Sequence, residues 1–412
     1  MDSSSGDAPL LSGVRVLSFG SVVAGNTCAV ILAELGADVV KVESWEHPEA
    51  LRAYDSAHQS ALYEPSGVRT TALFAGLTRS MRSVSIEMEI TAGRETFRTL
   101  VEHADVVIEN LGPGKMDSWR CGFAELTAHN PRVVMISISG YGRTGPLAAY
   151  KAYASNINNY LGLTAAWALD GTHFDFVAGV HGASAVLGAL AEVERGARGV
   201  FIDMAQTEAG AAVMAPLYLD FLANGREGGA APNEVPGALL SAVCRCQGAD
   251  EWVALELEDG RDWAILCAFL ERDDLVLQGG TVTPARRDAL NEALENWTRT
   301  VTALQATLKL QHAGLAVGAV QNDEDLWRDG QLRSRGCFVE VEHPDIGLVE
   351  YPAGPNRLSR TPGQVRARSA RLGEHTGAVL AEWLGCDEAA VRALRQVGAV
   401  WQPDDTSAYR QA

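Results

Sequence analysis

Apolar and polar residues follow two recurring patterns between residues 14 and 139. Short apolar runs rich in β-branched residues alternate with longer segments that carry apolar residues at helical spacing. This alternation predicts parallel strands joined by helices, as in a doubly wound α/β domain. The expected strands are VRVLSF (14–19), DVVKVE (38–43), DVVIEN (105–110) and PRVVMISIS (131–139), and the expected helices are NTCAVILAELGA (26–37), GRETFRTLVEHA (93–104) and FAELTAHN (123–130).

The remainder of the chain suggests a second, smaller domain. Residues 181–224 are rich in Ala and Leu and are expected to be mainly helical, with a break at RGARGVFID (195–203). The following segment has the Gly and Pro content of a linker. We predict a disordered N-terminus over 1–10, a large domain over 11–224, a linker over 225–237, a small α+β domain over 238–335, and a return of the chain to the large domain over 336–412.

The net charge of the chain argues against two classes of binding partner. Lys and Arg number 34 and Asp and Glu 52, which gives a formal net charge of −18. An acidic chain of this kind is not expected to bind nucleic acid or an anionic membrane surface. The polar N-terminus does not resemble a signal peptide, and no apolar run approaches the roughly 20 residues of a membrane span. We expect a cytoplasmic protein with a small-molecule ligand.

The seven cysteines are dispersed, which is typical of reduced thiols rather than of a disulfide framework. Cys244 and Cys246 form a C-x-C pair without a second Cys pair or a His cluster nearby, so no metal site is expected.

Turn residues follow several predicted strands and mark a candidate binding crevice. Gly20 and Gly25 lie in the first strand–helix turn, Asn110 ends a strand, and the Gly-rich turn GYGRTGP (140–146) follows another. Open α/β sheets bind ligands at this edge, and a helix start offers free N–H groups to anions. The G-x-G-x-x-G fingerprint is absent, so NAD is not indicated, although Glu43 ends a strand where dinucleotide-binding folds keep a ribose-binding acid.

No nucleophile elbow, P-loop or H-E-x-x-H motif occurs. His173 and His181 lie near Asp170 and Asp175 in the segment DGTHFDFVAGVHG (170–182), and a His–Asp pair there could act as a general base. The simpler interpretation is that Asp175 caps a helix and that His181 packs in the core.

Several segments taken together resemble the family III CoA-transferases, which include formyl-CoA transferase, carnitine CoA-transferase and α-methylacyl-CoA racemase. The resemblance covers almost the whole chain. It is carried by LSGVRVLSFGSVVAGNTCAVILAELGADVVKVES (11–44), RSVSIEME (82–89), ADVVIENLGPG (104–114), NPRVVMISISGYGRTGP (130–146), FVAGVHGASAVLGALAEVERGARGVFIDMAQTEA (176–209), RLSRTPG (357–363) and LGEHTGAVLAEWLGC (372–386).

The resemblance implies both a fold and a reaction. Each subunit is expected to have a Rossmann-like large domain with a parallel sheet and a smaller α+β domain, and two subunits interlock like linked rings. In the transferases, an aspartate attacks an acyl-CoA donor to form a mixed anhydride. CoA then returns to give an enzyme thioester, from which the acceptor acid removes it. CoA and acyl-CoA are thus substrates, and no covalently bound cofactor is expected.

The same resemblance predicts where the aspartate belongs. It follows the GYGRTGP turn in a segment of the form Y-D-x-x-x-Q, which here is YASNIN (153–158), so that Ala154 occupies the aspartate position. A racemase-like register places Ile157 there instead. No acid occurs over 147–169, so by this alignment the family's active-site strand has lost its nucleophile and the chain has no catalytic residue of its own.

CoA contacts are also carried over from the family. The family commonly has a lysine just after a strand of the form S-x-x-L-D-L, where this chain has Glu89 and Ile90. The arginine expected after the E-N-x-x-P-G turn is replaced by Ser118, with Arg120 close by. Arg79 and Arg82 are the other cations that could contact the CoA phosphates in place of the missing lysine and arginine. The candidate CoA-binding residues are Val22, Val23, Ala24, Arg82, Asn110 and Leu111.

These observations predict a non-catalytic subunit of a CoA-transferase. It would act on a donor such as succinyl-CoA and a carboxylic acid acceptor, with a paralogous subunit supplying the aspartate in a heterodimer or heterotetramer. Members of this kind act on aryl-succinates in anaerobic aromatic degradation, as succinyl-CoA:benzylsuccinate CoA-transferase does. Two alternatives remain open: a self-sufficient racemase- or lyase-like enzyme that uses Asp175 and His181, and a non-enzymatic acyl-CoA-binding scaffold.

Overall fold

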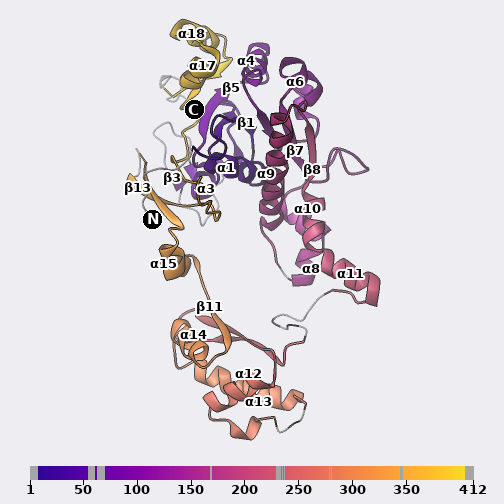
Figure 1. Ribbon diagram of the computed structural model, residues 1–412, viewed down its shortest axis with the longest axis vertical. Helices are drawn as coiled ribbons and strands as arrows, with labels where there is room; N and C mark the ends of the chain where they lie inside the picture. The colour runs from indigo at the N-terminus through magenta and orange to yellow at the C-terminus, as the bar shows by residue number, and fades with distance from the viewer. Residues whose placement is uncertain are drawn as a thin grey trace. The chain divides into compact units, whose positions relative to one another are not determined.

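The computed structural model describes residues 8–53, 61–62, 70–167, 169–228, 233, 235, 237–277, 279, 281–343 and 347–403. By their internal contacts the residues form two compact units, shown in Figure 1. The large unit combines Met1–Thr164, Leu169–Leu219 and Gly336–Ala412, and the small unit combines Ala165–Ala168 with Asp220–Arg335.

The large unit is built on a mostly parallel sheet, which confirms the predicted α/β class. Among the described residues the strand order is β14-β5-β2-β1-β6-β7-β8, and only β14 runs antiparallel to its neighbour. Without β14 this is the order of a doubly wound dinucleotide-binding fold, in which the topological switch point lies between β1 and β6. The strands are β1 (Arg15–Phe19), β2 (Asp38–Glu43), β5 (Arg82–Ile86), β6 (Val106–Glu109), β7 (Val134–Ser139), β8 (Phe201–Ala205) and β14 (Val400–Trp401).

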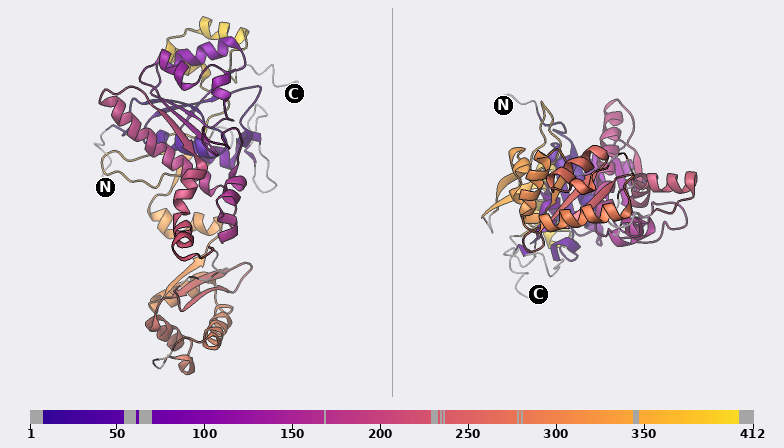
Figure 2. Two further views of the ribbon diagram at one scale, coloured as in Figure 1. Left: turned by 90° about the vertical axis from the view of Figure 1, so that its right-hand side faces the viewer. Right: turned by 90° about the horizontal axis from the view of Figure 1, so that it is seen from below.

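Helices cover both faces of this sheet, as Figure 1 and Figure 2 show. Alternate strand residues enter different cores, because successive side chains of a strand point to opposite faces. Val16 and Val106 pack with α1 and α9, whereas Leu17 and Val107 pack with the helices of the other face. The covering helices are α1 (Ala24–Glu34) and α9 (His173–Glu194) on one face and α4 (Thr91–Val101), α6 (Phe123–His129), α17 (Thr376–Leu384) and α18 (Glu388–Gln396) on the other.

The boundaries of these helices follow from local chemistry. The helix α1 ends before Gly36, whose φ of 115° lies in a region that favours glycine. The helix α3 (Ala72–Thr78) begins at Thr71, whose side chain accepts a hydrogen bond from the Phe74 N–H.

The helix α9 is longer and more apolar than expected, because the sequence predicted no apolar run near the length of a membrane span. It has 22 residues, and by length and composition alone it would suit a span. In the structure it lies along α1 and β7, and its residues Ala178, Ala183 and Val186 are buried in the core that these elements share. Its role in the described fold is therefore to cover the sheet.

Two other segments of the large unit differ from the sequence predictions. The segment expected as an active-site strand contains a helix, α7 (Ala154–Tyr160). The break in the helical region 181–224 leads into the strand β8. The strand-like segment after residue 336 does form strands in this unit; they pair as a separate hairpin, and β14 is the strand of the C-terminal region that joins the main sheet. The remaining elements of this unit are α2 (Ala50–Ala53), β3 (Ala61–Leu62), β4 (Thr70–Thr71), α5 (Lys115–Ser118), α10 (Gln206–Val213), β12 (Phe338–His343) and β13 (Gly347–Pro352), while α8 (Leu163–Trp167) and α11 (Ala215–Asn224) have residues in both units.

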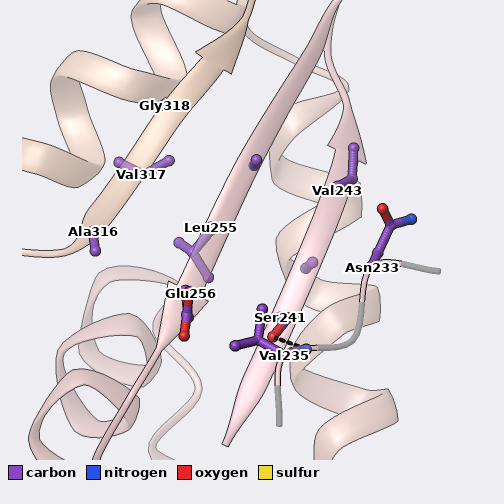
Figure 3. A pocket seen from close by; sticks show the side chains of 11 residues that line it. Asn233, Val235, Ser241, Val243, Leu255, Glu256, Ala316, Val317 and Gly318 are labelled. Carbon is purple, nitrogen blue, oxygen red and sulfur yellow. Dashed lines mark hydrogen bonds between the residues drawn. The ribbon is translucent and has the colours of Figure 1, made fainter. Parts of the chain in front are cut away.

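The small unit is α+β. Its antiparallel strands β9 (Leu240–Arg245), β10 (Trp252–Leu257) and β11 (Ala316–Val320) pack one face against α12 (Gly260–Phe269), α13 (Pro284–Thr298) and α14 (Ala303–His312). The short helices η1 (Asp273–Leu275), α15 (Asp323–Arg328) and α16 (Gly330–Ser334) complete it. A pocket on this sheet, drawn in Figure 3, has a volume of about 370 Å³ and is lined mostly by small side chains. Glu256 is the one ionisable residue among the described lining residues. Among the described residues the lining offers no cation, and the hydroxyl oxygen of Ser241 accepts a hydrogen bond from the Val235 N–H with no base beside it in the lining, so this pocket is a weak candidate for chemistry.

A buried ion pair joins β2 to the helix α2. The Arg52 guanidinium is fully buried and donates to both carboxylate oxygens of Glu43, at 2.7 and 2.9 Å. It also lies 4.0 Å from the centre of the Phe74 ring. Burial alone would raise the pKa of Glu43, but the charges of Arg52 and Lys41 hold that pKa below its ordinary value. Glu43 is therefore engaged in the fold and does not present a free carboxylate to a ribose.

We predict that Arg52→Met destabilises the protein by about 3–5 kcal/mol, because it leaves the Glu43 charge buried without its partner. The matched control is Arg392→Met, whose exposed pair with Glu388 one turn away should contribute only about 0.5 kcal/mol. Urea unfolding followed by circular dichroism measures both. Equal effects of the two substitutions would contradict the prediction.

Candidate active site

A cavity of about 550 Å³ opens in the large unit at the carboxyl ends of β1, β6 and β7. This is the edge that the sequence predicted, beside the switch point between β1 and β6. Three turns after the strands, the segment that leads into α7, and the starts of α9 and α10 all contribute to its wall. The residues that line it are Ser21, Val22, Val23, Ala50, Leu51, Leu73, Asn110, Leu111, Gly112, Pro113, Ile138, Ser139, Gly140, Tyr150, Lys151, Ala152, Tyr153, Ala154, Ser155, Thr172, Asp175 and Gln206.

The first strand–helix turn is held in a conformation that a β-branched residue rarely adopts. Val22 has a φ of 56°, in the left-handed region. Its N–H donates to Glu49 Oε1 at 2.7 Å, and its carbonyl accepts from the Asn26 amide at 2.8 Å. The Asn110 side chain accepts from the Ser21 N–H at 2.6 Å and donates to the Ser21 carbonyl at 2.7 Å. These bonds fix the turn and join it to the loop after β6.

A buried cation lies beneath this turn. Lys41 Nζ is 2.5 Å from Glu49 Oε2 and donates to Asn26 Oδ1 at 3.0 Å and to the carbonyl of Gly20. The side chains of Lys41 and Glu49 are 3% and 4% exposed. Burial raises the pKa of Glu49 above its ordinary value, against the opposing charge of Lys41. The lysine is thus committed to the scaffold of the turn.

Asp175 is the single carboxylate among the described residues that line the cavity. It lies in the first turn of α9, is 8% exposed, and accepts a 2.6 Å hydrogen bond at Oδ1 from Gln206 Nε2. Within the described part of the chain, Oδ2 has no hydrogen-bonding partner. Burial raises the pKa of Asp175, and the bond from Gln206 opposes this only in part. The carboxylate is therefore weakly stabilised and open to the cavity.

Close helix packing places Asp175 at the cavity. A Cβ on Gly179 would lie 2.5 Å from the Thr27 Cβ, so only glycine permits α9 to approach α1 so closely. A Cβ on Gly210 would similarly lie 2.9 Å from the Phe174 ring, which brings α10 against the start of α9. These contacts hold the first turn of α9 beside both the first strand–helix turn and Gln206.

The position predicted for the family aspartate also lines the cavity. Ala154 is the first residue of α7, and Tyr153 and Ser155 flank it in the wall. Ile157, the alternative register, is fully buried and lies outside the lining. The segment 147–169 contributes no acid to the cavity, as its sequence requires, and Asp175 brings a carboxylate to the same cavity from another helix.

The predicted His–Asp pair does not form. His173 contacts the backbone carbonyl of Asp170 at 3.1 Å, and His181 is exposed on α9. Asp175 bonds to Gln206 and makes no helix cap, since α9 begins at His173, after the N-cap residue Thr172, without a side-chain cap. Neither histidine is therefore placed to act as a base on Asp175.

The candidate CoA-binding residues divide into two groups. Val22, Val23, Asn110 and Leu111 line the cavity, whereas Ala24 is buried in α1 outside the lining. Arg82 lies at the opposite, amino-terminal end of β5 and pairs with Asp38 and with Glu382. The prediction that Arg82 contacts CoA is therefore corrected, because its guanidinium is committed to these two carboxylates away from the cavity. Among the described residues of the lining, Lys151 is the only cation.

A second pocket of about 310 Å³ adjoins the first at Ser21 and Leu111. Its wall is rich in acids and includes the aromatic rings of Phe19 and Trp119. Glu89 lies there, where Lys115 donates to it at 2.6 Å. The ionisable lining residues are Lys41, Glu43, His47, Glu49, Glu87, Glu89 and Lys115. No group of His, Cys, Asp and Glu among the described residues is arranged to hold a metal ion.

Comparison with known proteins identifies relatives over almost the full length. The family model described as CoA-transferase family III matches residues 11–376. The chain is 30% identical over 402 residues to the alpha subunit of succinyl-CoA–L-malate CoA-transferase from Chloroflexus aurantiacus, covering 93% of this chain and 91% of that one. It is 29% identical over 407 residues to the beta subunit of that name from the same species, covering 94% and 97%.

A solved structure supports the fold. The crystal structure of a CAIB/BAIF family protein from Brucella suis superposes with a TM-score of 0.83 at 26% identity. It covers 92% of this chain and 100% of that one.

We predict that Asp175→Asn raises the stability of the protein at pH 7. The folded-state pKa of Asp175 lies above its unfolded-state value, so this carboxyl destabilises the fold progressively as the pH rises between the two. The gain should shrink as the pH falls toward 3.8, the ordinary aspartate value. Thermal unfolding of both proteins across this pH range measures it. A loss of stability at pH 7 would contradict the burial argument.

Proposed function

The chain belongs to CoA-transferase family III, and from that premise we propose that it transfers CoA from an acyl-CoA to a carboxylic acid with Asp175 as its own nucleophile. The observation that carries the proposal is that Asp175 alone, among the described residues, brings a carboxylate into the cavity at the carboxyl edge of the sheet. A carboxylate is the group this reaction requires, because its first intermediate is an acyl anhydride.

The environment of Asp175 suits a nucleophile. Its only hydrogen bond within the described chain comes from a neutral amide, so no cation lowers the reactivity of the carboxylate. The apolar side chains of Val22, Leu73 and Ile138 line the same cavity and would limit access of water to an anhydride. The raised pKa of Asp175 also means that transfer should weaken as the pH falls through that value, since only the ionised form attacks.

This proposal replaces the hypothesis of a subunit that depends on a partner's aspartate. That hypothesis rested on Ala154, and Asp175 supplies a carboxylate to the same cavity. A second family III chain, either a copy or a paralogous subunit, is still proposed as the partner in an interlocked dimer. Large apolar side chains exposed on the large unit support it, among them Tyr160 and Val180, which are 60% and 51% exposed. The relatives named as alpha and beta subunits support it as well.

The proposed substrates are dicarboxylic acids and their CoA thioesters. Lys151 is the one cation among the described residues of the lining, and no ion pair or hydrogen bond joins its side chain to another of them. It could therefore bind the carboxylate that is not being activated. Succinate, malate and aryl-succinates all carry such a second carboxylate, so succinyl-CoA is the donor to assay first.

We predict that the chain purified alone transfers CoA from succinyl-CoA to malate or benzylsuccinate. Asp175→Ala should lower the rate by about 10³-fold or more, because it removes the group that forms the covalent intermediates. Transfer is followed by chromatography of the acyl-CoA products, and the covalently bound CoA is detected by intact-protein mass spectrometry.

The matched control is Asp170→Asn, an acid in the same segment that does not line the cavity, and it should keep its activity. Activity that appears only with a paralogous subunit, and that survives Asp175→Ala, would restore the subunit hypothesis. Exchange of the α-proton of an acyl-CoA without CoA transfer would instead favour the racemase-like alternative. Binding of acyl-CoA without either reaction would favour the scaffold.

A further inference from the structure

The hydrogen bond from Gln206 to Asp175 selects one oxygen of the carboxylate. Gln206 Nε2 lies 2.6 Å from Oδ1, and both residues are buried in the cavity wall. Oδ2 has no partner in the described chain, so it is the oxygen available to attack a thioester. After that attack Oδ2 bridges to the acyl group, and Oδ1 remains as the carbonyl oxygen of the aspartyl half of the anhydride.

We propose that Gln206 is the oxyanion donor for attack on the aspartyl carbonyl, an inference that rests on the proposed role of Asp175. In the first step, the Oδ2–acyl bond forms, the acyl C–S bond breaks, and CoA leaves as a thiolate. In the second step, the thiolate attacks Cγ of Asp175, and the Cγ–O bond to the acyl group breaks. The donor acid leaves as a carboxylate, and CoA remains bound as an aspartyl thioester.

Negative charge develops on Oδ1 when the thiolate attacks Cγ, because the carbonyl electrons move onto that oxygen. The acceptor carboxylate places charge on Oδ1 again when it attacks Cγ and expels the thiolate. A donor fixed within hydrogen-bond distance of that oxygen stabilises both tetrahedral intermediates. In the outer steps, where the substrate acyl carbon is attacked, the charge lies on the acyl oxygen instead.

The fold holds Gln206 in place for this role. Gln206 is the first residue of α10 and follows β8 directly. The next residue, Thr207, donates its N–H to the carbonyl of Gly140 at 3.0 Å, which fixes the start of the helix to the turn after β7. The close contact of Gly210 with Phe174 sets the distance between α10 and the turn that carries Asp175. The donor is therefore preorganised and needs no movement during the reaction.

A neutral donor suits both the free carboxylate of Asp175 and the oxyanion that forms when its carbonyl carbon is attacked. An arginine or lysine at this place would pair with the ionised carboxylate and lower its tendency to attack. A glutamine amide forms a weaker bond to the carboxylate and can still support the developing oxyanion. The arrangement predicts that Gln206 assists the two steps in which Cγ of Asp175 is attacked. The two steps in which the substrate acyl carbon is attacked should be unaffected.

The test compares Gln206→Met, which keeps the side-chain volume but removes the donor, with the wild type. Formation of the aspartyl-CoA thioester from succinyl-CoA in a single turnover should slow by about 10²–10³-fold. Both steps are followed at a pH well above the pKa of Asp175, because the loss of the bond from Gln206 raises that pKa further. There the first step, followed by trapping the released CoA thiol with a thiol reagent, should keep its rate. A purely structural role would slow both steps alike, and that result would overturn the proposal.

Two controls accompany this variant. Thr207→Val changes a buried polar neighbour on the same helix that does not line the cavity, and it should form the thioester at the wild-type rate. Gln206→Leu repeats the test if the methionine variant does not fold.

The two proposals can fail separately. If Asp175→Ala still forms enzyme-bound CoA, the assignment of the nucleophile is wrong. If Asp175→Ala forms none while Gln206→Met forms it at the wild-type rate, only the role of Gln206 is wrong.

Discussion

A buried contact between Lys41 and Glu49 supports the turn around which the cavity is built. Glu49 uses its other oxygen to hold the N–H of Val22 in a left-handed conformation that valine alone would disfavour. Removing either charge would leave the other uncompensated in a site from which water is almost excluded. The shape of the wall at Ser21 and Val22, and its link to Asn110, therefore depend on this ion pair.

Asp175, in the cavity, lacks the cationic partner that the other buried acids of this region have. The scaffold acids Glu43 and Glu49 receive a cation each, whereas Asp175 receives one neutral amide. A buried carboxylate with so little support is unfavourable for stability, and a fold selected for stability alone would pair or remove it. The contrast within one unit supports the proposed role of Asp175 as a nucleophile.

Much of the large unit could be predicted from its sequence, because periodicity reports local structure. The segment 38–43 reads as a strand and forms β2 over the same residues. The strand β8 was missed because its short run follows a Gly- and Arg-rich break and faces solvent along part of its length. The site was harder to predict. Ala154, Asp175 and Gln206 come from the starts of three helices, and a register argument within one segment cannot show that these helices converge.

The sequence also could not show which charged side chains pair with one another in the fold. The second pocket contains four glutamates, and the sequence suggested that Glu89 would repel a phosphate. In the structure Glu43 pairs with Arg52, Glu49 with Lys41 and Glu89 with Lys115. The hydrogen bond from Lys115 contributes most to a pKa of Glu89 below its ordinary value, so this carboxylate stays ionised within its pair. Pairing cancels much of the field that formal charges imply, and the acidity of the chain is therefore compatible with an anionic substrate such as CoA.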